Sequence, residues 1–142
     1  MKRQDPTCLF VYGTLRQDPS HEMFHLLAKH ARYLGEARVP GRLFDLGAYP
    51  GMVWPDERRS VVGEVYEIDP AEWDRVIERL DEYEGCGPSD PLPHEYRREI
   101  VNTRLSNGTG LNAWAYVLNR PPSETREIRS GDYLAWREGA AR

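Results

Sequence analysis

The chain has 142 residues, the size of one domain. Its 23 acidic and 19 basic residues give a net charge of −4, and no long basic run offers the phosphate-neutralising surface that nucleic-acid binding needs. Two cysteines do not build a disulfide framework, and the apolar run near the start is too short for a signal peptide or a membrane span. We therefore expect a cytoplasmic protein that binds neither nucleic acid nor membrane.

The first half of the chain alternates strand signals with turn residues. Residues 8–12 are apolar and predict a buried strand that runs directly into Gly13. A short helix should follow, with Ser20 as its N-cap. Further along we expect strand structure over residues 33–44 with a break at 40–41, a turn at 49–51, and another strand over residues 61–68.

The strongest helix signal follows that last strand. Asp69 can cap the helix, Pro70 fits its first turn, and Gly85 is suited to end it. Apolar residues recur between these limits at helical spacing, at Trp73, Val76, Ile77 and Leu80.

The remaining sequence favours strands. Two are expected over residues 96–105 and 111–118, joined across Asn107 and Gly108, which are typical of a hairpin. A short amphipathic segment is expected in the tail near residues 133–136. These elements together predict a strand-dominated α+β domain, a curved sheet or small barrel with two or three helices.

One position at the end of the predicted helix carries a carboxylate where the periodicity predicts an apolar residue. At about 100° per residue from Trp73, Glu82 falls at roughly 180°, on the solvent side, whereas Glu84 falls at roughly 20°, within the apolar stripe. Desolvation and the helix dipole would both raise the pKa of an inward-facing Glu84, which suits a general base. If the helix frays before Glu84, this side chain points to water instead, and the spacing leaves both orientations open.

A glycine directly follows the first predicted strand. Gly13 lets the backbone turn and approach a ligand, and the exposed N–H groups of such a turn can bind a carboxylate or a phosphate. A turn without a ligand is the ordinary role of glycine at such a position. The residues alone leave both interpretations open.

Two further patterns contain residues typical of catalytic sites. His21, Glu22 and His25 match H-E-x-x-H, which on a helix can bind zinc with the glutamate as base. The histidines fall opposite the apolar side of that helix, so two solvated side chains are the alternative. Cys86 with His94 could supply a thiol nucleophile, although an unreactive loop thiol explains Cys86 equally simply.

Several short motifs follow one another in a fixed order. Residues 11–16 read Val-Tyr-Gly-Thr-Leu-Arg, and residues 80–85 read Leu-Asp-Glu-Tyr-Glu-Gly. These resemble the Y-G-[ST]-L signature and the L-D-x-x-E-G block of the gamma-glutamylcyclotransferase-like (AIG2-like) family. Similar blocks lie between and after them, in the family's order, at residues 49–51, 63–66, 96–98 and 113–116.

The resemblance implies a fold. It is an α+β fold, a small, mostly antiparallel β-barrel with flanking helices. We expect it as a single domain over residues 1–142, with the barrel core at about 8–118 and a C-terminal tail at 119–142.

The resemblance also implies a reaction, in which a γ-glutamyl amine or small γ-glutamyl conjugate cyclises to 5-oxoproline and releases the amine. Because the substrate carries its own nucleophile, the reaction needs no cofactor and no metal. Glu84 would be the general acid and base. The residues that would bind the substrate are Tyr12, Gly13, Thr14, Leu15 and Tyr116.

Two other classes of function stay open. A non-catalytic module of the same fold would bind a small ligand without turning it over, and the His21/Glu22/His25 pattern would make a zinc peptidase. Fold similarity does not fix the substrate, so the identity of the leaving amine stays open as well.

Overall fold

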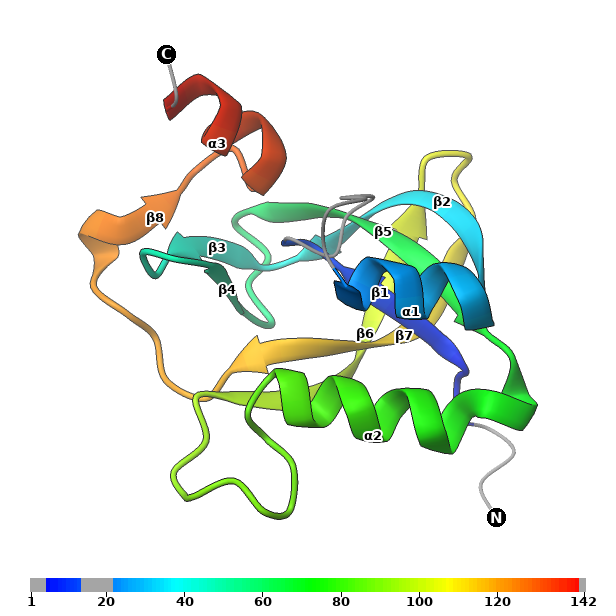
Figure 1. The fold of residues 1–142 in the computed structure, drawn as a ribbon. Helices are drawn as coiled ribbons and strands as arrows, with labels where there is room; N and C mark the ends of the chain where they lie inside the picture. The colour runs from blue at the N-terminus through cyan, green and yellow to red at the C-terminus, as the bar shows by residue number, and fades with distance from the viewer. Residues whose placement is uncertain (1–4, 14–21, 141–142) are drawn as a thin grey trace.

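A closed five-stranded barrel forms the centre of the computed structural model, which describes residues 5–13 and 22–140 (Figure 1). Neighbouring strands follow the order β1-β5-β2-β6-β7, and every pair is antiparallel except β1 and β7, whose parallel pairing closes the barrel. This confirms the fold class expected from the sequence. The barrel strands are β1 (Cys8–Val11), β2 (Ala31–Pro40), β5 (Ser60–Ile68), β6 (Tyr96–Leu105) and β7 (Gly110–Leu118).

A second sheet of three strands has the order β4-β3-β8. It contains β3 (Arg42–Asp45), β4 (Pro50–Val53) and β8 (Glu127–Ile128). The turn predicted at residues 49–51 is wrong in part, because Tyr49 lies in a bend but Pro50 begins β4. Proline is tolerated there because it is the first residue of an edge strand, where its missing N–H removes little from the ladder.

The described part of the chain also contains three α-helices, which are α1 (Glu22–His30), α2 (Trp73–Tyr83) and α3 (Tyr133–Ala140). Short 3₁₀ turns η1 (Pro70–Glu72) and η2 (Glu124–Arg126) precede α2 and β8. Asp69 accepts a hydrogen bond from the Ala71 N–H at 3.0 Å and so caps η1, whereas α2, which it was predicted to cap, begins after Glu72 without a side-chain cap. The Ser20 cap predicted for α1 lies outside the described residues. No helix in the described part of the chain is long and apolar enough to cross a membrane.

Two apolar layers hold these elements together. The interior layer joins the barrel strands to the second sheet and α3, and the other lies between the barrel and the pair α1 and α2. Strand β1 contributes to both, because alternate side chains of a strand point to opposite faces. Phe10 lies in the interior layer, whereas Leu9 and Val11 lie in the layer beneath the helices. The helix layer also contains Met23 and Leu27 of α1, with Val76, Ile77 and Leu80 of α2.

Candidate active site

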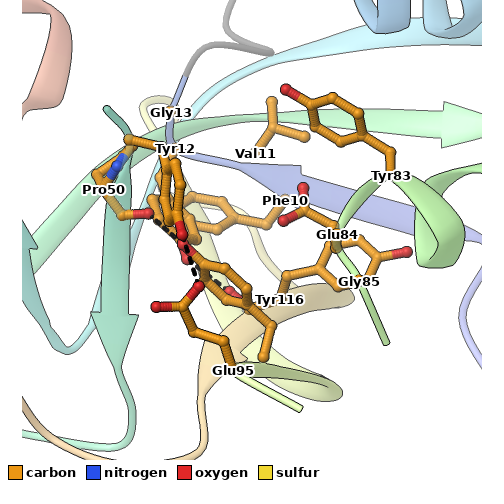
Figure 2. Close-up of a pocket in the computed structure, with 12 residues that line it drawn as sticks. Phe10, Val11, Tyr12, Gly13, Pro50, Tyr83, Glu84, Gly85, Glu95 and Tyr116 are labelled. Carbon is orange, nitrogen blue, oxygen red and sulfur yellow. Dashed lines mark hydrogen bonds between the residues drawn. The ribbon is translucent and has the colours of Figure 1, made fainter. Parts of the chain in front are cut away.

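A pocket of about 540 Å³ lies where the end of β1, the end of α2 and the start of β4 meet (Figure 2). It brings together segments that are far apart in the sequence, and its walls are largely aromatic. The lining residues are Phe10, Val11, Tyr12, Gly13, Tyr49, Pro50, Tyr83, Glu84, Gly85, Glu95, Tyr96 and Tyr116.

Glu84 reaches this pocket because the helical backbone continues one residue beyond α2. Its N–H donates to the Leu80 carbonyl at 2.9 Å, and its φ of −80° and ψ of −5° remain helical. Gly85, with a φ of +75°, then reverses the chain in a conformation that favours glycine. Of the two orientations left open by the sequence, the structure has the inward one, whereas Glu82 is exposed.

The Glu84 carboxylate has an unusual electrostatic environment. Among the residues that the structure describes, none forms a hydrogen bond or an ion pair with it. Burial, followed by the charges of Asp81 and Glu95, raises its pKa from 4.5 to about 7. A carboxylate with this pKa can accept and return a proton near neutral pH.

The neighbouring loop supplies the opposite wall. A Cβ atom on Gly13 would lie 3.0 Å from Pro50 Cγ, so glycine permits the close approach of this loop to the start of β4. Tyr12 and Gly13 thus share the pocket with Glu84. Thr14 and Leu15, which were predicted to bind substrate with them, lie outside the described residues.

Tyrosine side chains fix the shape of the pocket through bonds to the backbone. The Tyr12 hydroxyl donates to the Tyr116 carbonyl at 2.6 Å and accepts from the Met52 N–H at 3.1 Å. The Tyr96 hydroxyl donates to the Pro50 carbonyl at 2.7 Å. Burial is the largest cause of the raised pKa of both hydroxyls, which therefore stay protonated.

Tyr116, the remaining predicted binding residue, lines the pocket, but its hydroxyl donates outside it to Asp81 at 2.6 Å. Asp81 also accepts from Arg98 Nε at 3.0 Å and from Nη2 at 3.2 Å. The Arg98 guanidinium lies 4.7 Å from the centre of the Trp114 ring. This network ties the end of α2 to β6 and β7 and so determines where Glu84 stands.

The sequence analysis did not identify Glu95 and Tyr49 as site residues. The Tyr49 hydroxyl donates to Glu95 Oε1 at 2.7 Å, and both side chains line the pocket. The sequence did contain one signal for Glu95. It is a charged residue directly before a predicted strand, and such a residue lies at an end of a barrel, where ligand-binding sites occur. The hydrogen bond between Tyr49 and Glu95 could be identified only from the tertiary structure.

The structure gives less support to the zinc site and the thiol nucleophile considered from the sequence. His25 is exposed, while His21 and the Glu22 side chain lie outside the described residues. Among the described residues there is no group of three or more His, Cys, Asp or Glu that could hold a metal. Burial, with the charges of Asp81 and Glu84, raises the pKa of Cys86 to about 11, so this thiol stays protonated at neutral pH.

A small barrel has here a largely aromatic pocket with a glutamate that no described residue pairs with. This combination defines a class of site suited to acid–base chemistry on a small molecule. The comparisons with known proteins identify the family. The family model described as "Gamma-glutamyl cyclotransferase, AIG2-like" matches residues 9–135, and the chain belongs to this family. This confirms the family and the enzyme class expected from the sequence.

Relatives and solved structures agree with this assignment. The chain is 36% identical over 129 residues to the gamma-glutamylcyclotransferase family protein YtfP of Escherichia coli K12, covering 89% of this chain and 95% of that one. It is 37% identical over 131 residues to gamma-L-glutamyl-butirosin B gamma-glutamyl cyclotransferase of Niallia circulans, covering 91% and 76%. The crystal structure of an AIG2-like protein from Mus musculus has the same fold, with a TM-score of 0.69, 22% identity and coverage of 89% and 87%.

Proposed function

We propose that this protein is a γ-glutamyl cyclotransferase that converts a γ-glutamyl amine or small γ-glutamyl conjugate into 5-oxoproline and the free amine. The observation that carries the proposal is Glu84, whose carboxylate has no partner among the described residues and lies in the same pocket as Gly13. Family membership supports the reaction class, and the Niallia circulans relative is named for a reaction on a γ-glutamyl compound.

The chemistry needs few groups because the nucleophile belongs to the substrate. The substrate's α-amine attacks its γ-carbonyl carbon, a C–N bond forms to close a five-membered ring, and the C–N bond to the leaving amine breaks. Two protons leave the α-ammonium as it becomes the lactam N–H, and two protons arrive on the leaving nitrogen, so no water or co-reactant is consumed. Glu84 would carry these protons in turn.

The pocket would supply geometry as well as proton transfer. Holding the α-amine and γ-carbonyl in contact contributes much of the rate of an intramolecular reaction. In this proposal the backbone at Tyr12, Gly13, Thr14 and Leu15 binds the glutamyl group, and its N–H groups stabilise the oxyanion that forms on the carbonyl. Tyr116 completes the wall against which the substrate lies.

The test is a panel of γ-glutamyl compounds assayed for 5-oxoproline, with wild type and Glu84→Gln compared. Glutamine keeps the shape but cannot carry the proton, so we expect turnover to fall by about 100- to 10,000-fold while substrate still binds. Binding is measured by calorimetry on the inactive variant.

Glu82→Gln is the matched control, because Glu82 lies two residues earlier and is exposed. Equal activity of wild type and Glu84→Gln would remove Glu84 from the mechanism. Tight binding of γ-glutamyl compounds without any 5-oxoproline would instead indicate a binding module.

A further inference from the structure

A second carboxylate lines the same pocket and has no part in the proton transfers proposed above. Glu95 comes from the segment that joins α2 to β6, directly before Tyr96 begins the strand, and Figure 2 shows it entering the pocket from a different element than Glu84. Its main chain is fixed, because its carbonyl accepts from the Asn119 N–H at 2.9 Å. Its side chain is fixed by the 2.7 Å hydrogen bond from Tyr49.

Glu95 stands at the solvent side of the pocket. Its side chain is exposed, and the Tyr49 side chain is 41% exposed, whereas Glu84 is half-buried. The glutamyl part of a substrate must lie against Glu84 for the reaction, so the amine part extends toward solvent, where Glu95 and Tyr49 lie.

The charge of the pocket favours a cation there. Glu84 and Glu95 are the charged members of the lining that the structure describes, and both are acidic. Glu95 forms no ion pair with any described residue, in contrast to Asp81, which Arg98 neutralises. Clefts lined by one sign of charge concentrate ligands of the opposite sign.

Aromatic rings add to this preference. The Tyr49 ring, whose hydroxyl donates to Glu95, has its centre 6.2 Å from the centre of the Tyr96 ring, and both rings line the pocket. The faces of aromatic rings attract ammonium groups, and the effect adds to that of a nearby carboxylate. A neutral alkyl chain would gain binding energy from packing against the rings but none from the charge of the carboxylate.

We propose that Glu95 and Tyr49 form a specificity site for the leaving amine, and that the preferred substrate is a γ-glutamyl amide of a diamine, whose distal ammonium binds to the Glu95 carboxylate beside the Tyr49 ring. This inference rests on the proposed cyclotransferase function. It orders the substrates of this chain by the charge of the leaving group, with cationic amines first, neutral amines next, and amino acids that bring a carboxylate last.

The experiment compares two substrates that differ in one charge. One is the γ-glutamyl amide of a four-carbon diamine, and the other is the γ-glutamyl amide of a straight-chain monoamine of matched length. For wild type we expect kcat/KM for 5-oxoproline release to be about tenfold higher with the diamine, mainly through KM, and the ratio to shrink as salt is added.

Glu95→Gln should bring this ratio close to one, and Tyr49→Phe should lower it by a smaller factor. The ratio is the informative quantity, because removing the Glu95 charge also changes the pKa of Glu84, which affects both substrates alike. Glu82→Gln is the control and should keep the wild-type ratio, because Glu82 is exposed and does not line the pocket.

The outcomes separate this inference from the function on which it rests. If both substrates yield 5-oxoproline with equal efficiency in wild type, the specificity site is wrong and the cyclotransferase stands. If Glu95→Gln changes kcat/KM for both substrates by the same factor and so keeps the wild-type ratio, Glu95 does not distinguish the leaving amines and the inference is again overturned. If neither these substrates nor the panel yields 5-oxoproline, the cyclotransferase proposal itself fails.

Discussion

Asp81 and Glu84 lie three residues apart at the end of α2, but their carboxylates have opposite surroundings. Asp81 faces β6 and β7 and accepts hydrogen bonds from Arg98 and Tyr116. Glu84 faces the pocket, where no described residue donates to it. The compensated carboxylate fixes the helix end, and the uncompensated one is available to a substrate. At this helix end, the carboxylate that can react with a substrate is therefore the one to which no described residue donates.

The largest effect that separates the two acids should be the pH dependence of activity. If Glu84 is the base, it must be ionised in the free enzyme, and its pKa of about 7 places the change near neutrality. We expect kcat/KM to rise about tenfold per pH unit between pH 5 and 7 and to bend near 7. Steady-state assays of 5-oxoproline release across this range measure it. A profile that is flat from pH 5 to 7 would contradict the assignment.

The same pKa predicts an effect on stability. The pKa of Glu84 is 4.5 in the unfolded chain and about 7 in the folded protein. As pH rises between these values, the carboxylate ionises in the unfolded chain first, and the free energy of unfolding therefore falls. One pKa unit corresponds to about 1.4 kcal/mol, so Glu84→Gln should stabilise the protein by up to about 3 kcal/mol above pH 7 and little below pH 4.5. Urea unfolding at several pH values tests this. The expected curve for Glu82→Gln follows wild type throughout.

Asp81→Asn should act mainly on structure. It weakens the bonds from Arg98 and Tyr116 and leaves the guanidinium uncompensated, which should cost about 1–3 kcal/mol of unfolding free energy. Loss of the negative charge should also move the bend of the pH profile to lower pH, because Asp81 raises the pKa of Glu84. Glu78→Gln, at an exposed position of the same helix, should change stability by less than about 0.5 kcal/mol.

Tyr116→Phe should give the smallest effect. It removes the hydroxyl that donates to Asp81 but keeps the ring against the pocket, so we expect a loss of about 1 kcal/mol in stability. The Arg98 contacts to Asp81 remain, so the pH profile should keep its bend near neutrality. Loss of activity as complete as in Glu84→Gln would show that the Tyr116 hydroxyl has a direct role in the reaction.

Local sequence patterns determined the elements whose stability depends on near neighbours. The spacing of Trp73, Val76, Ile77 and Leu80 located α2, and Gly85 marked its end, because caps and helical periodicity are short-range properties. Asp69 marked the start of the 3₁₀ turn η1, which leads into α2. The strands predicted over residues 61–68 and 96–105 are likewise confirmed within one residue at each end. The same periodicity put Glu84 within the apolar stripe on condition that the helix continued that far, which the structure shows it does.

The tertiary structure decided the features that depend on distant residues. Pro50 reads locally as a turn residue but begins β4, because it lies opposite Asp45 of β3, and β3 pairs on its other side with the tail strand β8. Glu95 enters the site only because Tyr49, 46 residues earlier, is brought beside it. The sequence alone determined the helix and offered an inward direction for its last acid, whereas the tertiary structure decided that direction. The partners of each carboxylate, and thus its chemistry, arise from long-range packing that no local pattern encodes.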